Sequence, residues 1–180
     1  MPSPPPPGRE LARMNSGHPG GGTVVRESIR SRFYRFLFGL FPCYRRTGVR
    51  LVHISPDLRE IRIKLPLNWK TRGYNGSIFG GSMYASIDPV YMTMISWHLG
   101  RDYIAWDRAA TIEFRKPGRT ALYSTFRIDD SLLDGIRAEL ESAPRAERVF
   151  NVELVDDAGV VHASFVKTIV VRKRVKPGAE

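Results

Sequence analysis

The chain has 180 residues, of which 42% are hydrophobic, so it is long enough for one domain with a buried core. No apolar run reaches the roughly 18 residues that a membrane-spanning helix needs, and the single cysteine, Cys43, excludes an internal disulfide framework. The formal net charge of +10 suits nucleic acid, membrane surfaces or phosphorylated ligands, and it equally suits a plain solvated surface.

The N-terminal segment 1–24 is rich in Pro, Gly and Ser and poor in large apolar residues, so we expect a disordered tail there. The segment has no apolar core of a secretory signal, and a lone cysteine fits a reducing compartment. We therefore expect a cytoplasmic protein. A second short tail is expected over 176–180.

Residues 25–42 are predicted to form an amphipathic N-terminal helix that Pro42 ends. Apolar side chains recur at three- and four-residue spacings from Ile29 to Leu40, and arginines occupy other positions. Such a helix can pack its apolar face on its own domain or lie on a membrane. We favour packing on the domain, and peripheral membrane contact through residues 25–40 is the alternative.

The hydrophobic period then changes to two, which predicts strands over 49–55 and 59–67 around a Pro-Asp turn. A glycine-containing loop follows. Residues 82–99 are predicted to form a long central helix, because apolar side chains from Met83 onward make one broad stripe and Gly100 is a stop signal.

Four further strand patterns cover 103–114, 120–129, 148–156 and 160–174, and a short helical insert is expected at 131–143. The last two strands meet through an Asp-Ala-Gly turn, which is typical of a hairpin. A mostly antiparallel sheet wrapped around the central helix buries the apolar faces of both. We therefore predict an α+β fold of that kind.

The most informative stretch is YNGSIFGGSMYASIDP, residues 74–89. Gly76, Gly80 and Gly81 let a ligand approach the backbone, and the first amides of the following helix carry a partial positive charge. Asp88 falls about two turns into the helix near its apolar face, where a carboxylate is costly unless it is paired or useful. Together these groups predict hydrolysis of an activated acyl group, with Asp88 as general base or nucleophile. The alternative is that the Asp-Pro dipeptide caps a helix that begins or restarts there.

This stretch resembles the loop–helix signature of hotdog-fold acyl-CoA thioesterases of the phenylacetyl-CoA thioesterase-like type. In that signature an Asn-containing loop, a Gly and a His-Gly-Gly precede an acid seven residues on. The matching positions are Asn75, Gly76, Gly80, Gly81 and Asp88. The resemblance extends from about 26 to 174. The segments DYIAWDRAATIEF and FGGSMYASIDPVYM are most similar to an uncharacterised branch, a domain of unknown function sometimes labelled tetrameric acyl-CoA thioesterase.

The resemblance implies a single hotdog domain over 25–175, in which a curved antiparallel sheet wraps the central helix. It also implies homodimers, often paired into homotetramers, with active sites between subunits. The Gly81 amide would polarise the thioester carbonyl, Asp88 would activate water or attack directly, and Asn75 would help to position substrate or water. The other residues expected to contact the substrate in this stretch are Gly76, Phe79, Gly80 and Ser82.

The sequence departs from the family signature at two positions. Phe79 stands where the family has its histidine and cannot donate a hydrogen bond, and Pro89 directly follows the acid and predicts a kink that re-aims it. Two alternatives therefore stand beside a thioesterase. One is a non-catalytic hotdog protein that binds acyl-CoA or lipid. The other is a charge-driven binder of nucleic acid or membrane surfaces, with nucleic acid less favoured because the basic stretch 172–176 lacks interleaved aromatics.

Three cations, Arg115, Lys116 and Arg119, cluster in one turn and are expected to receive the phosphates of coenzyme A, with a solvated turn as the alternative. Asp107 and Arg108 are predicted to form an ion pair near the mouth of the site. The four histidines do not have the spacing of a metal site, so we expect no metal and no cofactor.

Overall fold

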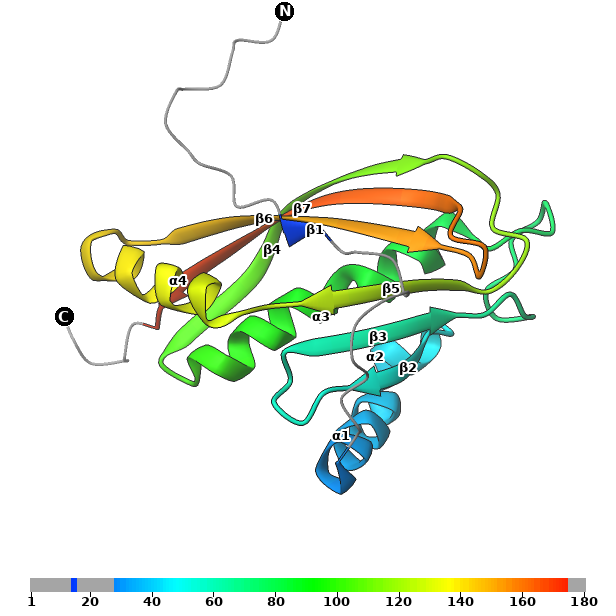
Figure 1. The fold of residues 1–180 in the computed structure, drawn as a ribbon. Helices are drawn as coiled ribbons and strands as arrows, with labels where there is room; N and C mark the ends of the chain where they lie inside the picture. The colour runs from blue at the N-terminus through cyan, green and yellow to red at the C-terminus, as the bar shows by residue number, and fades with distance from the viewer. Residues whose placement is uncertain (1–13, 16–27, 175–180) are drawn as a thin grey trace, which may run out of the picture.

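Figure 1 shows the computed structural model, which describes residues 14–15 and 28–174. The tails predicted over 1–24 and 176–180 lie outside the described residues, except for β1 (Met14–Asn15). This short strand pairs in parallel with Phe150 and Asn151 of β6 (Ala146–Val155). None of the helices in the two described ranges combines the length and apolarity that crossing a bilayer requires.

In the described part of the chain, a seven-stranded sheet curves over one long helix (Figure 1). Apart from β1, the strand order is β2-β3-β5-β6-β7-β4 and every pairing is antiparallel. The remaining strands are β2 (Arg50–Ile54), β3 (Glu60–Leu65), β4 (Tyr103–Phe114), β5 (Leu122–Arg127) and β7 (Val161–Lys173). The helices are α1 (Ile29–Leu40), α2 (Pro42–Arg46), α3 (Gly80–Leu99) and α4 (Asp130–Ser142). The predicted α+β architecture is confirmed.

Aromatic contacts fix α3 against the sheet. Tyr91, near the middle of the helix, stacks on Phe150 of β6 with ring centroids 4.1 Å apart and meets Phe126 of β5 edge-on at 5.2 Å. All three side chains are almost fully buried. Burying each such side chain contributes about 1.5–3 kcal/mol, so this cluster sets where α3 lies under the sheet.

The helix α3 begins two residues earlier than predicted, at Gly80 rather than residue 82, and it runs unbroken to Leu99. Phe79 is its N-cap residue, and Pro89 lies inside the helix. The alternative that a helix begins or restarts at Asp88 is therefore wrong. Gly80 and Gly81 are the first two residues of the helix, so the first two amides of α3 belong to these glycines.

The helix α1 packs on β2 with a different face from the one predicted. Its stripe of exposed side chains is apolar and includes Phe33 and Phe36, whereas Ser31 is buried and Tyr34 turns inward. Tyr34 meets Trp97 of α3 edge-on at 5.1 Å, so an aromatic contact decides the orientation of the helix rather than the most apolar stripe.

The start and end of the N-terminal helix also differ from the prediction. Ser28 caps α1 by accepting a hydrogen bond from the Ser31 amide at 3.1 Å, so the helix begins at Ile29, and residues 25–27 lie outside the described residues. Pro42 does not end the helical region. It occupies the first turn of α2, where its missing N–H costs nothing.

The strand β4 contains a bulge at Arg108. Asp107 pairs with Ile169 of β7 and Ala109 pairs with the next residue, Thr168, so Arg108 has no partner in the ladder. Odd-numbered residues before the bulge and even-numbered residues after it therefore face α3. Asp107 lies on the inward side of the strand, one residue before this irregularity.

Candidate functional site

The front of α3 offers backbone amides that no side chain of the described residues caps. The carbonyl of Phe79 accepts hydrogen bonds from the amides of Ser82 and Met83 at 2.9 and 3.1 Å. Within the described part of the chain, the amides of Gly80 and Gly81 have no acceptor. These two N–H groups carry the partial positive charge of the helix start and suit a polarised carbonyl oxygen.

Two aromatic rings flank these glycines. A Cβ atom at Gly81 would lie 2.3 Å from Cε1 of Phe79, and one at Gly80 would lie 3.0 Å from Cζ of Phe114. The rings are themselves 61% and 56% exposed. They occupy the space that side chains at the glycines would need, so only glycine fits at these two positions unless the rings move.

The loop before α3 is shaped by Asn75 and Gly76. The side-chain oxygen of Asn75 accepts hydrogen bonds from the hydroxyl and the amide of Ser77 at 2.7 and 3.3 Å. Gly76 has a φ of +77°, a conformation that favours glycine. Asn75 thus stabilises the turn, and its role in positioning substrate or water remains a prediction.

The predicted phosphate-binding turn lies directly beside this loop. The amide of Ile78 donates to the carbonyl of Gly118 at 2.8 Å, and the amides of Arg115 and Lys116 donate to the carbonyl of His162 at 2.9 and 3.2 Å. The structure therefore brings the turn 115–119 to the front of α3. These hydrogen bonds join segments that lie far apart in the sequence.

The three cations of that turn are not equivalent. Arg115 pairs with Glu113, with Nη2 3.1 Å from Oε2, so its charge is already partly satisfied. Lys116 and Arg119 are exposed, and neither has a carboxylate partner among residues 28–174. Lys116 and Arg119 are therefore the better placed of the three to receive a phosphate.

Asp88 is held by a buried lysine. Its side chain is 43% exposed, whereas Lys167 of β7 is fully buried. The Lys167 ammonium donates to the backbone carbonyl of Asp88 and lies 3.5 Å from its Oδ1 and 3.1 Å from Oδ2 of Asp107. A lysine in a protein core is stable only with such carboxylate and carbonyl partners. The carboxylate of Asp88 thus contacts this lysine and is otherwise partly exposed to solvent.

Asp107 and Tyr84 complete a four-residue group, which we call the Asp88 cluster: Tyr84, Asp88, Asp107 and Lys167. Burial raises the pKa of Asp107, with Asp88 adding to the shift and Lys167 opposing it. Burial, followed by the hydrogen bond and the charge of Asp88, raises the pKa of Tyr84 to about 12. Tyr84 therefore keeps its phenolic proton at neutral pH and can donate a hydrogen bond to the Asp88 carboxylate.

Lys167 was not among the predicted site residues, although the strand pattern contains a signal for it. The nearest residues of β7 on the same face as Lys167 are Ala163, Phe165, Ile169 and Val171, all of which are buried. A lysine in an otherwise apolar, inward-facing set is rarely buried without a partner of opposite charge. This position alone would have predicted an acidic partner inside the fold.

The predicted ion pair between Asp107 and Arg108 is wrong. Asp107 turns toward α3 and contacts Lys167, whereas Arg108 contacts Glu147 of β6, with Nη1 2.5 Å from Oε1. The two side chains are neighbours in a strand and project to opposite faces of the sheet, so each finds a different partner.

The glycine amides and the Asp88 carboxylate do not meet within one chain. Asp88 comes seven residues after Gly81, which places it about 10 Å farther along the helix axis at 1.5 Å per residue. That separation is about three hydrogen-bond lengths. One carbonyl group therefore cannot contact both groups of the same chain.

The family described as Domain of unknown function (DUF4442) matches residues 30–171. The chain belongs to this family. The match covers α1 through nearly all of β7, including the front of α3 and the Asp88 cluster. No curated protein shows significant sequence similarity to this DUF4442 chain.

Solved structures show that this DUF4442 chain has the hotdog fold that the sequence resemblance implied. The Pseudomonas aeruginosa protein of unknown function PA5026 is 18% identical, with a TM-score of 0.69 over 79% of this chain and 95% of its own. Thioesterase HI1161 from Haemophilus influenzae is 11% identical, with a TM-score of 0.62 over 87% and 99%. PaaI from the phenylacetic acid degradation operon of E. coli is 14% identical, with a TM-score of 0.55 over 80% and 92%.

Proposed function

We propose that this protein is an acyl-CoA thioesterase that hydrolyses a thioester to a free acid and coenzyme A. The observation that carries the proposal is the Asp88 cluster. In this cluster the buried ammonium of Lys167 contacts the half-exposed carboxylate of Asp88, near the middle of α3. A stable fold does not need this buried ion pair, since apolar residues in place of both Lys167 and Asp107 would often cost no more. Thioesterase HI1161, which shares the fold, supports the same reaction class.

In the proposed reaction the acyl carbonyl oxygen accepts hydrogen bonds from the free amides of Gly80 and Gly81. The Asp88 carboxylate takes a proton from a water molecule, whose oxygen attacks the carbonyl carbon. The tetrahedral intermediate then collapses, the carbon–sulfur bond breaks, and the proton held by Asp88 passes to the leaving thiolate. Lys167 and Tyr84 position the carboxylate but do not contact the reacting atoms.

The proposed site is shared between two copies of the chain. In the described part of the chain, β4 pairs only with β7 and is an edge strand of 12 residues. An edge of that length invites pairing with a second copy, which joins the two sheets into one. Antiparallel packing of two α3 helices then brings Gly81 of one copy toward Asp88 of the other. A homodimer is the smallest such assembly, and a homotetramer would pair two of them.

The coenzyme A moiety is proposed to lie over the turn 115–119. Lys116 and Arg119 are exposed there without carboxylate partners in the described chain, and the turn is hydrogen-bonded to the loop before Gly80. Phosphate groups bound at this turn would set the thioester near the glycine amides.

The proposed function is tested by following free thiol release from short-chain, medium-chain and aromatic acyl-CoAs with a thiol-trapping dye. We expect turnover of at least one class, saturating with substrate. Tight acyl-CoA binding measured by calorimetry, without thiol release from any substrate, would instead establish a non-catalytic acyl-CoA binder. Phe79 favours that second function, because it places a ring with no hydrogen-bond donor at the helix start.

Replacing Gly81 by alanine is expected to lower kcat/KM about tenfold or more, because the new methyl group and the displaced Phe79 ring would crowd the oxyanion position. The ring is exposed and can turn aside, so the fold is expected to survive. The matched control is Gly135→Ala on α4, where the nearest atom would be 3.5 Å away. Equal activity in both variants would remove the Gly81 amide from the mechanism.

A further inference from the structure

The outward face of α1 is apolar. In the described structure the stripe that faces away from the domain consists of Ile29, Phe33, Phe36 and Leu37, and Phe41 extends it after the helix end. Phe33 and Phe36 are 59% and 65% exposed. Contiguous exposed apolar side chains of this kind mark a surface that contacts something else.

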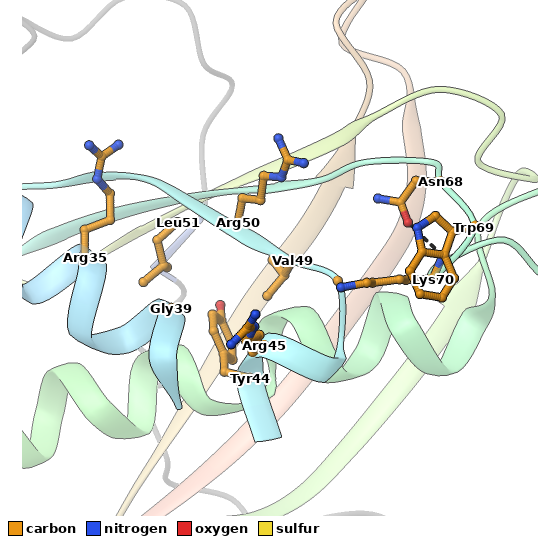
Figure 2. A pocket seen from close by; sticks show the side chains of 11 residues that line it. Arg35, Gly39, Tyr44, Arg45, Val49, Arg50, Leu51, Asn68, Trp69 and Lys70 are labelled. Atoms are coloured by element: carbon orange, nitrogen blue, oxygen red, sulfur yellow. Dashed lines mark hydrogen bonds between the residues drawn. The ribbon is translucent and has the colours of Figure 1, made fainter. Parts of the chain in front are cut away.

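A basic pocket adjoins this helix. It has a volume of about 510 Å³, and Arg35 and Gly39, one turn apart on α1, form one of its walls. Figure 2 shows the other cations around it: Arg45 of α2, Arg50 of β2 and Lys70 from the loop after β3. Among the residues that the structure describes, four cations line the pocket and no carboxylate does. The pocket therefore suits an anionic group, and phosphate fits arginine and lysine well.

The walls of the pocket are fixed by contacts to the core. Tyr44, which lines the pocket, is buried and donates its hydroxyl to the carbonyl of Ser86 in α3 at 3.2 Å. Arg35 donates to the carbonyl of Val52 at 3.2 Å. Gly48, with a φ of +80°, lies so close to Thr71 that a Cβ atom there would be 2.4 Å from its methyl group. The pocket is thus part of the folded domain rather than a gap between loose side chains.

Trp69 stands at the rim of the same pocket and is 84% exposed. Lys70 places its ammonium group over the indole ring, 5.2 Å from the centroid. Tryptophan beside a cation is the combination that membrane proteins enrich at the level of the lipid headgroups, where the ring is amphipathic and the charge meets phosphate.

We propose that the apolar stripe of α1, Trp69 and the basic pocket form a docking surface for a membrane that contains anionic phospholipids. Phe33 and Phe36 enter the boundary between headgroups and acyl chains, and the phosphate of an anionic lipid occupies the pocket between Arg45 and Lys70. The function goes beyond thioester hydrolysis and does not depend on it.

Charge favours a membrane over a second copy of the chain as the occupant. Arg32 lies on α1 beside the stripe, and Arg45 and Arg46 follow it on α2. In the described chain no carboxylate pairs with these three arginines. In a twofold dimer formed through this surface, the arginines of one copy would face the same arginines of the other and repel them. An anionic bilayer would instead neutralise the arginines.

The proposal is tested by sedimenting the full-length protein with vesicles of phosphatidylcholine alone or of phosphatidylcholine mixed with phosphatidylglycerol. Binding is expected only to the mixed vesicles and is expected to weaken as salt rises. Trp69 should show a blue-shifted emission on binding, and the variant Trp69→Phe should lose that change while Trp97 and Trp106 remain.

Two double variants separate the apolar and charged parts of the surface. Phe33→Ser with Phe36→Ser, and Arg45→Glu with Lys70→Glu, are each expected to weaken binding about tenfold or more. All four side chains lie on the surface, so the fold should persist, which circular dichroism checks. The matched controls are Val166→Ser and Arg101→Glu, an exposed apolar residue and an exposed cation elsewhere, and both should bind as the unmodified protein does.

Three outcomes would overturn the proposal. The first is no binding to either vesicle type. The second is binding that the phenylalanine variants leave unchanged, which would mean general charge attraction without insertion. The third is a smaller oligomer by light scattering in the phenylalanine variants together with unchanged vesicle binding, which would assign the stripe to contacts between copies of the chain.

Discussion

Replacing Lys167 by methionine is expected to lower the free energy of unfolding by about 3–5 kcal/mol. The change keeps the length of the side chain but removes the only cation that contacts Asp107 in the described structure. The other carboxylate oxygen of Asp107, Oδ1, is buried there without a hydrogen bond. It also removes a donor to the backbone carbonyl of Asp88. Urea denaturation followed by circular dichroism measures the difference.

The control for this variant is Lys173→Met at the exposed end of the same strand, which should change stability by no more than about 0.5 kcal/mol. Adding Asp107→Leu to Lys167→Met removes the stranded carboxylate and should restore most of the lost stability. If Lys167→Met is as stable as Lys173→Met, the buried lysine does not stabilise the cluster and our account of how Asp88 is held fails.

Replacing Asp88 by asparagine is expected to lower kcat about 10²–10⁴-fold, the usual effect of losing a general base. Asparagine keeps the shape of the side chain, and Asp88 is partly exposed, so the fold should persist. Hydrolysis of the best acyl-CoA substrate, measured by thiol trapping, gives the comparison. Asp102→Asn, an exposed acid in the turn after α3, serves as the matched control and should keep full activity.

Mixing the two impaired variants tests whether the site is shared. If Gly81 and Asp88 of different copies act together, random pairing of Gly81→Ala with Asp88→Asn subunits restores one intact site in half of the dimers, or about a quarter of full activity. A site within one chain would give no recovery. Unchanged turnover of Asp88→Asn by itself would remove the carboxylate from the chemistry.

Much of the fold could be predicted because single elements carry strong periodic signals. The alternation in β3 places Ile61, Ile63 and Leu65 in the core, and the stripe on α3 predicts its buried face, including Met83 and Ile87. These elements pack on one another with the faces that their sequences indicate, so local pattern and tertiary structure agree.

The errors occur where tertiary contacts decide between local alternatives. The sequence predicts that the apolar stripe of α1 faces the domain, but the face with Tyr34 does, because Tyr34 contacts Trp97 of α3. The local sequence of α1 does not indicate that partner. At the site, the sequence contains the glycines and Asp88 as a motif with recognisable spacing. The hydrogen bonds from Lys167 to Asp88 and from the loop before Gly80 to the turn 115–119, however, join residues about 40–80 positions apart. A single sequence shows the residue types at such contacts and not their pairing.

The bulge at Arg108 also makes β4 one residue longer than its partner strand requires. Deleting Arg108 would leave Asp107 opposite Ile169 and Ala109 opposite Thr168, so every other side chain of the strand would keep its orientation. A deletion elsewhere in β4 would instead exchange inside for outside over part of its length. The strand would straighten, however, since a bulge adds local twist. Deleting Arg108 would therefore change the path of β4, and with it the position of Phe114 at the front of α3. The side chains of the strand would still point to the same faces of the sheet.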